Sequence, residues 1–303
     1  MIKFYNEESI KEIWDSNILN LSNPTFYQSY NFSQICKDGK KVVYVCDRDN
    51  YDDIKIMCFA KIYDDRISIP FGPVFKSDIT INEILDFVDN IRKLYNKSVV
   101  FSLPPEFINE KILLNSNLEI GWHFVTPLVS TENSIEKIVK NCNENRRRII
   151  KRVLNNIPQS DMKMGLKYAD DFIKLYEKRM KETNGEIDLS INYLNKLLEY
   201  DNIKLTVCLN NDKLIAGSVT FEYGDTLITR YNCFDSDFSK LSPIARIDYE
   251  LLKYASESSE IKYFDMSGLA VDENITEKEY NLNRYKLSYR PQKELSYQFV
   301  KYK

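Results

Sequence analysis

Three strand-like runs follow one another in residues 204–235, which read KLTVCLNNDKLIAGSVTFEYGDTLITRYNCFD. The runs cover residues 204–209, 213–223 and 226–235, and a polar turn and a glycine-containing turn separate them. Apolar runs of this length with such turns between them are typical of antiparallel strands. The stretch therefore predicts a three-stranded meander.

A helix and a further strand are expected to follow this meander. Residues 243–258 begin with Pro243, and proline is favoured in the first turn of a helix. Residues 261–266 form the next strand-like run. The predicted order is thus three strands, one helix and one strand.

The first half of the chain has the same predicted order. Its strand-like runs are residues 41–46, 54–63, 66–71 and 98–103, and its helices are residues 9–19 and 81–95. Cys46 lies 162 residues before Cys208, and Phe101 lies 163 residues before Phe264. This near-constant offset predicts one α/β unit used twice. The expected fold is α/β (α+β), with two tandem domains of mixed, mostly antiparallel sheet flanked by helices.

The composition limits the chemistry open to the chain. Among its 303 residues are 8 glycines, 6 cysteines and one histidine, His123. The glycine spacing allows neither a Walker loop nor a dinucleotide-binding G-x-G-x-x-G motif. A Ser–His–Asp or Cys–His site would depend on His123, which lies between Trp122 and Phe124 and is expected to be a core or interface side chain. The remaining catalytic groups are lysine, arginine, tyrosine, aspartate and the backbone.

The cysteines and the charge indicate a cytoplasmic protein without a metal site. The cysteines form neither a C-x-x-C pair nor a zinc-binding spacing, so we expect reduced core thiols. A net charge of −3 argues against a dedicated nucleic-acid binder. No secretory signal and no apolar run of about 18 residues are visible, so no membrane span is expected. The sequence does not predict an oligomeric state.

The longest helical pattern covers residues 134–156. Its apolar stripe continues from Cys142 to Arg146, four residues later, so Arg146 is expected on the packed face. The basic run 146–152 fits a solvated helix face, a phosphate or RNA-backbone contact, or an inter-domain salt bridge. The position of Arg146 on the stripe favours an anion or carboxylate partner.

Three charged residues of the second half are candidates for a site. Arg230 interrupts an apolar strand and needs a salt-bridge partner or a substrate there. Asp265 ends a strand, where ligands of open α/β sheets gather, although it could equally form a turn with the residues that follow. Lys286 is expected on the opposite face of a strand-like run from Tyr285 and Tyr289. There it could hold a phosphate or an oxyanion, or cover the surface.

Motifs that resemble those of one family occur in order along nearly the whole chain. They are Thr25–Ser29 (P-F-x-Q-S/T), Ile69–Val74 (P-x-G-P-V), Asn145–Arg152 (N-x-R-R-x-I-K-K-A), Phe172–Gly185 (F-Y-x-L-Y…T-x-x-R-x-G), Leu214–Gly217 (x-I-A-G), Leu241–Pro243, Tyr263–Gly268 (Y-D-F-G-G) and Tyr285–Tyr289 (F-K-x-x-F-G). In this order they resemble the Fem-type (FemAB-like) aminoacyltransferases, which build peptidoglycan interpeptide bridges, and the related GNAT-like acyltransferases. The chain departs from the last motif at Tyr285 and Arg290, and it has Ser267-Gly268 in place of the glycine pair.

The resemblance implies two GNAT-like domains, at residues 1–133 and 157–290, which a linker helix at 134–156 connects. It implies that the terminal strand, residues 291–303, returns to the first domain. It also implies transfer of an aminoacyl group, expected from aminoacyl-tRNA, onto an amine of a cell-wall precursor. A muropeptide or another small molecule would be the acceptor, bound in a cleft between the domains. The resemblance also allows a transient contact of the protein with the inner face of the membrane.

Lys286 matches the family lysine that stabilises charge developing at the reacting ester, and Asp265 is expected to remove or orient the amine proton. The expected substrate-binding residues are Arg230, Tyr231, Tyr285, Tyr289, Gly72 and Arg146. No cofactor is expected, because aminoacyl-tRNA or acyl-CoA acts as co-substrate.

Two alternatives remain. The first is an acyl-CoA-dependent N-acyltransferase acting on an amino sugar or peptide, although residues 239–245 lack the Q/R-x-x-G-x-G/A signature. The second is a non-catalytic binding module of the same fold, a reading that Arg290 motivates.

Overall fold

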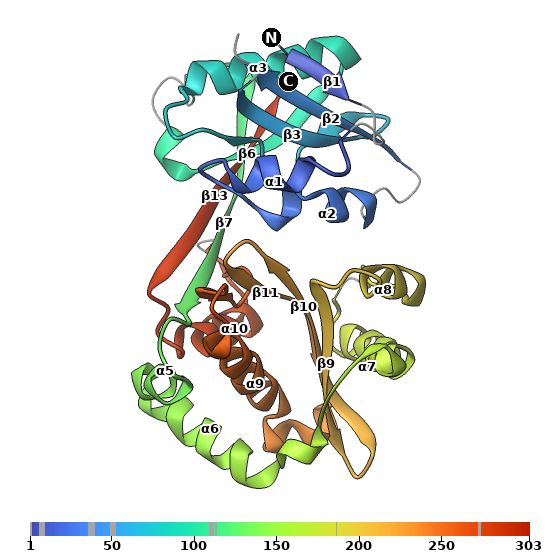
Figure 1. Ribbon diagram of the computed structural model, residues 1–303, viewed down its shortest axis with the longest axis vertical. Helices are drawn as coiled ribbons and strands as arrows, with labels where there is room; N and C mark the ends of the chain where they lie inside the picture. Colours follow the sequence, from blue (N-terminus) through green and yellow to red (C-terminus); the bar gives the residue numbers. More distant parts are fainter. Residues whose placement is uncertain are drawn as a thin grey trace. The chain divides into compact units, whose positions relative to one another are not determined.

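The chain divides into two compact units (Figure 1). The first unit is Met1–Val125 with Ser296–Lys303, and the second is Thr126–Leu295. The computed structural model describes residues 2–5, 10–35, 40–48, 53–108, 112, 114–185, 187–271 and 274–303. The units divide inside a strand, eight residues before the boundary at 133 that the sequence suggested. The helical segment 134–156 is part of the second unit.

The sheet of the first unit has the strand order β1-β2-β3-β4-β6-β13, and β5 pairs with β3. The strands are β1 (Ile2–Tyr5), β2 (Lys41–Arg48), β3 (Ile54–Ile62), β4 (Arg66–Ser68), β5 (Val74–Phe75), β6 (Ser98–Leu103) and β13 (Lys293–Tyr302). Neighbours from β1 to β4 are antiparallel, whereas β4 and β6 are parallel. The end of β13 pairs antiparallel with β6, so the C-terminal residues complete the first unit.

Helices cover both faces of this sheet. Helix α3 (Ile81–Tyr95) starts with a capping box and packs on a core that includes Val43 and Val45 of β2. Between these two valines, Tyr44 points to the opposite face and contacts Trp14 of α1 (Trp14–Leu19). Helix α2 (Tyr30–Ile35) lies beside α1 (Figure 1).

The sheet of the second unit has the order β7-β12-β11-β10-β9-β8. The strands are β7 (Leu118–Ser130), β8 (Met162–Met164), β9 (Ile203–Asn210), β10 (Lys213–Tyr223), β11 (Thr226–Phe234) and β12 (Tyr263–Asp265). Strands β8 to β11 form antiparallel pairs, and β12 is parallel to β11 and antiparallel to the end of β7.

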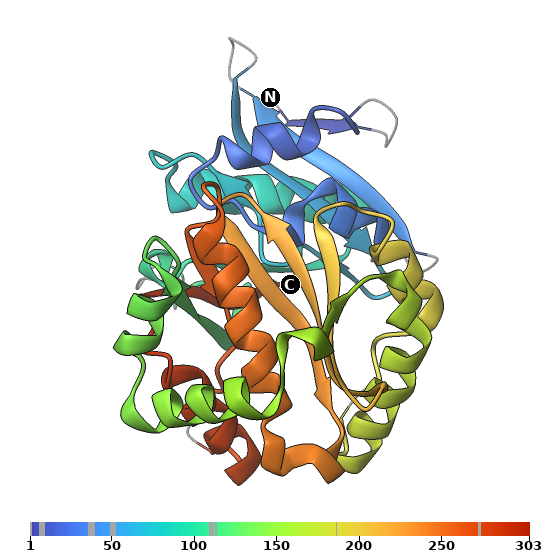
Figure 2. The same cartoon turned by 60° about the horizontal axis from the view of Figure 1, so that its bottom comes forward.

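The helices of the second unit also cover both faces of its sheet. They are α5 (Ile135–Asn141), α6 (Glu144–Asn156), α7 (Ala169–Glu182), α8 (Ile191–Leu197), α9 (Pro243–Glu257) and α10 (Glu277–Leu287). Helix α9 packs on one face of β9–β11, and α7 and α8 lie on the other (Figures 1 and 2). Helix α6 packs against α9. Short 3-10 helices are η1 (Phe26–Gln28), η2 (Pro105–Phe107), η3 (Gln159–Asp161), η4 (Leu166–Tyr168) and η5 (Ser236–Leu241).

The repeated α/β unit predicted from the sequence is confirmed. In each unit a three-stranded meander leads into a helix, α3 or α9, and then into a strand parallel to the third. Phe101 and Phe264 occupy equivalent places, in β6 and β12, and both are fully buried. The predicted fold class, two α/β domains with mixed sheets and flanking helices, is therefore correct.

Two predicted elements are wrong. Residues 134–156 form two helices, because Cys142 is extended and the Asn143 side chain accepts a hydrogen bond from the Arg146 N–H at 2.8 Å, which starts α6. Tyr285 and Lys286 lie in helix α10, where a strand was expected. Tyr289 follows the end of this helix, and its ring lies near that of Tyr285, with ring centres 5.9 Å apart.

Cys46, Cys58, Cys142, Cys208 and Cys233 are buried free thiols, whereas Cys36 lies outside the described residues. The first helix begins at Trp14, five residues after the expected start at residue 9, and residue 9 also lies outside the described residues.

Across the described ranges, none of the helices combines the length and the apolar character needed to cross a bilayer.

Candidate active site

A pocket of about 210 Å³ lies in the second unit, on the sheet face that α9 covers. Its lining residues come from β11, α9, α10 and the segment after β12, and they are Thr229, Asn232, Phe234, Ile244, Asp248, Met266, Leu282, Tyr285 and Lys286. A second cavity of about 200 Å³ shares Phe234, Ile244 and Tyr285 with it and extends to the start of α9. The two cavities thus adjoin along one side of α9.

Lys286 brings a buried positive charge to this pocket. Its side chain is buried, and its Nζ donates hydrogen bonds to the backbone carbonyls of Ser267 (3.2 Å) and Gly268. Burial lowers the pKa of Lys286 from its usual value of 10.5 to about 8, against the opposing effect of the Asp265 and Asp248 carboxylates. Below that pH the lysine is a fixed cation at the pocket wall. Because its side chain is buried, Lys286 is not the surface lysine that the sequence analysis kept as an alternative.

Asp248 places a buried carboxylate at the same pocket. Its Oδ2 accepts hydrogen bonds from the hydroxyl groups of Tyr285 (2.5 Å) and Tyr289 (3.0 Å). Burial raises the pKa of Asp248, whereas these hydrogen bonds and the positive charges of Arg146 and Lys286 lower it. The carboxylate is thus held in place from one side by two tyrosines.

Arg146 packs against the two tyrosines that hold Asp248. Its guanidinium lies 4.0 Å from the centre of the Tyr285 ring and 4.7 Å from that of Tyr289, and its Nε donates to Ser288 Oγ at 2.8 Å. The packed position expected for Arg146 is confirmed, since only 4% of the residue is exposed. Arg146 and Tyr289 do not line this pocket, so any role in substrate binding remains a prediction for both.

Asp265 lies next to the pocket residue Met266 without lining the pocket itself. Its Oδ1 accepts hydrogen bonds from Thr126 Oγ1 (2.5 Å) and from the Ser267 N–H (2.7 Å). The second of these is the turn interaction that the sequence left as an alternative to a catalytic role. Burial raises the pKa of Asp265. Its assignment as a catalytic residue stays a prediction.

Arg230 and Tyr231 lie on β11 between two residues that line the pocket, Thr229 and Asn232. The Arg230 side chain is partly exposed and lies 3.7 Å from a carboxylate oxygen of Asp188. Tyr231 is buried edge-to-face against Tyr176, with ring centres 6.0 Å apart. Neither residue lines the pocket, and their substrate-binding roles also remain predictions.

Gly72 belongs to the first unit, unlike the other expected site residues. A Cβ atom at this position would lie 2.8 Å from the side chain of Gln28. That side chain is fixed, because its Nε2 donates to the Pro70 carbonyl (2.6 Å) and its Oε1 accepts from the Phe59 N–H (2.9 Å). The packing of Gln28 thus explains the glycine, and it joins the Thr25–Ser29 motif to the Ile69–Val74 motif.

The structure brings together four of the expected residues around one that the sequence analysis missed. Lys286, Tyr285, Tyr289 and Arg146 all act on Asp248 through hydrogen bonds or charge. The sequence did contain a signal, because Asp248 interrupts the apolar stripe of α9. Ile244 precedes Asp248 by four residues, and Leu251 and Ala255 follow it by three and seven residues. A charge in the middle of such a stripe indicates a partnered or functional group.

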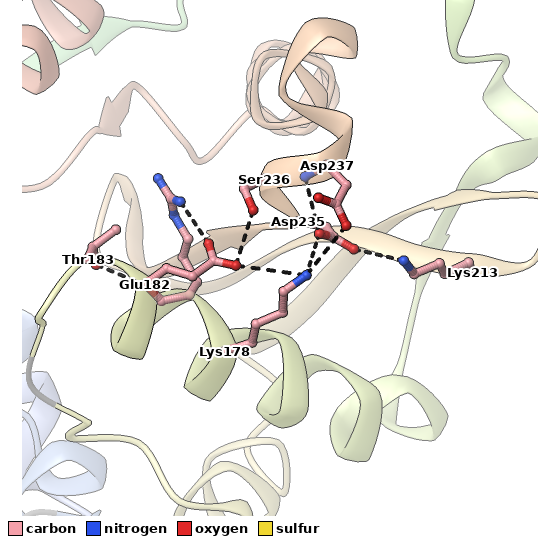
Figure 3. A network of polar contacts seen from close by, with 8 residues as sticks. Lys178, Glu182, Thr183, Lys213, Asp235, Ser236 and Asp237 are labelled. Atoms are coloured by element: carbon pink, nitrogen blue, oxygen red, sulfur yellow. Dashed lines mark hydrogen bonds and ion pairs between the residues drawn. The ribbon is translucent and has the colours of Figure 1, made fainter.

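A second polar cluster in this unit has the features of a structural ion-pair network (Figure 3). The buried carboxylate of Asp235, at the end of β11, lies 2.7 Å from Lys178 Nζ of α7 and 2.8 Å from Lys213 Nζ of β10. Lys178 also lies near Glu182 and Asp237. The two lysines lower the pKa of Asp235 to about 2. The cluster is fully paired and holds α7 to the sheet.

Within the described ranges there is no group of three or more His, Cys, Asp or Glu residues that could hold a metal ion. The polar groups that line the pocket are an ammonium, a carboxylate, a hydroxyl, an amide and a phenol.

Residues 144–286 match the family model described as acetyltransferase (GNAT) domain. This range thus resembles a GNAT acetyltransferase domain. The matched range contains every residue that lines the pocket and ends at Lys286. The candidate site thus lies within the range that matches an acetyltransferase (GNAT) domain.

Solved structures share the fold of the GNAT domain and of the chain around it. The crystal structure of FemX is similar with a TM-score of 0.76 and 12% identity, over 98% of this chain and 96% of that chain. L-PGS from Bacillus licheniformis has a TM-score of 0.63 and 9% identity, over 96% and 91%. A tandem GNAT protein from the clavulanic acid biosynthesis pathway has a TM-score of 0.57 and 8% identity, over 99% and 98%. No curated protein sequence matches the chain.

Proposed function

We propose that this chain transfers an aminoacyl group from aminoacyl-tRNA onto an amine of a cell-wall precursor or a similar acceptor. The observation that carries the proposal is the buried ammonium of Lys286 at a pocket inside the GNAT domain. The ordered Fem-type motifs and the fold shared with FemX support the aminoacyl group over other acyl groups. Because charged tRNA is a cytoplasmic donor, this function places the protein in the cytoplasm.

The chemistry of the proposed reaction needs few groups. The amine nitrogen attacks the ester carbonyl carbon, a C–N bond forms, and the carbonyl oxygen becomes an oxyanion. The fixed cation of Lys286 stabilises that oxyanion, and the ester C–O bond then breaks to release the tRNA hydroxyl. Since the ester is already activated, holding amine and ester in the right orientation supplies much of the remaining rate.

An acyl-CoA is a second candidate donor. The match of residues 144–286 to a family described as acetyltransferase favours it. The acceptor amine and the role of Lys286 would be the same, because a thioester is attacked in the same way. The missing Q/R-x-x-G-x-G/A signature at residues 239–245 weighs against this donor.

Transfer assays with both donors test the proposal. The purified chain is incubated with tRNA charged with labelled amino acids, or with labelled acetyl-CoA, and with a muropeptide precursor or simple amines. We expect label to enter an amide with aminoacyl-tRNA and not with acetyl-CoA. Transfer from acetyl-CoA alone would favour the second candidate. Binding of an acceptor without transfer from either donor would contradict both and favour a binding module.

A further inference from the structure

One oxygen of the Asp248 carboxylate has no donor among the described residues. Both hydrogen bonds to this carboxylate, from Tyr285 and Tyr289, end on Oδ2. Asp248 lines the pocket, although only 3% of the residue is exposed. Oδ1 is therefore the place where a bound molecule can donate.

The pocket walls define the kind of molecule that fits there. Phe234, Ile244, Met266 and Leu282 provide apolar surface, so a chain of methylene groups is well accommodated. The carboxylate provides an acceptor for N–H groups and a countercharge for an ammonium. A volume of about 210 Å³ suits a group of side-chain size rather than a whole nucleotide or sugar peptide.

We propose that Asp248 binds the attacking nitrogen of the acceptor and takes its proton, and that this acceptor is a primary amine at the end of an aliphatic chain. The proposal rests on the proposed function, because it concerns the acceptor of the same transfer reaction. It assigns to Asp248 the proton-accepting role that the sequence gave to Asp265, because Asp248 lines the pocket and Asp265 does not.

The proton balance of the step is as follows. The acceptor enters as an ammonium, and Asp248 Oδ1 takes one proton, which leaves a neutral amine. The amine attacks the ester carbonyl, so that a C–N bond forms beside the Lys286 cation. A second proton leaves the nitrogen as the ester C–O bond breaks, and the departing oxygen is protonated. The products are an amide and a free hydroxyl, and no oxidant or further reactant is needed.

The groups around Asp248 suit it to this role. Tyr285 and Tyr289 donate to it, Arg146 and Lys286 are the charges that act on it, and burial raises its pKa. A base is most effective when its pKa approaches the working pH. The two tyrosines also fix the carboxylate so that Oδ1 keeps one orientation in the pocket.

The test combines an amine-binding measurement with a pH–rate profile on the full-length chain. Asp248→Asn keeps the shape of the side chain and removes its charge. Tyr285→Phe/Tyr289→Phe keeps the carboxylate and removes both hydrogen bonds. Binding of n-butylamine, with n-butanol as the uncharged control, is followed by NMR, and thermal unfolding confirms that each variant is folded.

We expect n-butylamine, and not n-butanol, to bind the wild type at Asp248, and this binding to be lost in Asp248→Asn. The kcat/KM of the same variant should be at least about 100-fold lower than that of the wild type. The decrease of kcat/KM at low pH, which is the acid limb of the pH profile, should also disappear. Removing the tyrosine hydrogen bonds should move that limb to higher pH, because they lower the pKa of Asp248.

The possible results separate this inference from the proposed function. An Asp248→Asn protein that binds n-butylamine and transfers as well as an active wild type overturns the role of Asp248 and leaves the function standing. A folded wild type that binds n-butylamine but transfers from neither donor overturns the proposed function, and the catalytic part of the inference falls with it.

Discussion

The side chain of Lys286 carries a charge where burial disfavours one. Its folded-state pKa is about 8, against 10.5 for a free lysine. Between these two values the unfolded chain binds more protons than the folded chain, so stability increases as the pH rises through this window. At neutral pH the charged lysine instead reduces stability. Retaining a charge at such a cost is typical of functional sites.

The substitution Lys286→Met should remove this pH dependence. From pH 8 to 10.5 the wild type should gain about 3 kcal/mol of unfolding free energy relative to the variant, since one pKa unit corresponds to about 1.4 kcal/mol. Denaturant unfolding of both proteins across this range measures the difference. A difference that stays constant with pH would mean that Lys286 is not a desolvated ammonium.

Gly72→Ala should destabilise the first unit. The added Cβ would meet the Gln28 side chain at 2.8 Å, and both ends of the Gln28 amide are hydrogen-bonded. We expect a loss of about 1–3 kcal/mol, measured by denaturant unfolding. Because the strain requires Gln28, the loss should be smaller in a Gln28→Ala background. Equal losses in both backgrounds would show that Gln28 is not the cause.

Part of the candidate site could be identified residue by residue from the sequence. Lys286 and Tyr285 were found because they stand in a motif, and both line the pocket. Asp248 was missed because its partners, Tyr285 and Tyr289, are 37 and 41 residues away in the sequence. No local pattern brings those three side chains together.

At the scale of elements, predictions succeeded where the local signal was strong. Helix α3 and strand β6 have the expected bounds, because a capping box starts the helix and Pro104 follows the strand. The strand-like alternation at residues 285–289 was misleading, because the capping box of Thr276 and Glu279 starts a helix that continues through Leu287. After the break at Cys142, the Asn143 side chain caps the start of α6.

Asn143→Ala should weaken the start of α6. The Asn143 side chain caps this helix by accepting the Arg146 N–H, and losing such a cap costs about 1 kcal/mol. Ser134→Ala is the matched control, since Ser134 precedes α5 without a capping hydrogen bond from its side chain. Chemical denaturation should show a larger loss for Asn143→Ala. Equal losses for the two variants would contradict the capping role.

At the scale of the whole molecule, one α/β unit occurs twice, with a separate core in each copy. The core of the first unit includes Phe101, and that of the second includes Phe264. The constant offset along the sequence was enough to predict this repeat. It was not enough to predict that β7 and β13 each contribute residues to both units, because strand pairing over such sequence distances has no local signal.

Phe101→Ala and Phe264→Ala should each affect their own unit. Truncating a buried phenylalanine costs about 3–5 kcal/mol. Hydrogen exchange should show lost protection in β2 and β3 for Phe101→Ala and in β9 and β10 for Phe264→Ala. If either substitution removed protection from both units equally, the two cores would behave as a single cooperative unit.

The most direct test of the account is amide formation by the wild type and by Lys286→Ala, measured in single turnover with labelled aminoacyl-tRNA and a primary amine. Lys278→Ala, which changes an exposed lysine of the same helix, is the control. We predict that Lys286→Ala loses about 100-fold or more in rate while staying folded, and that the control retains the wild-type rate. A folded Lys286→Ala protein with the wild-type rate would contradict the claim that this pocket is the site of acyl transfer.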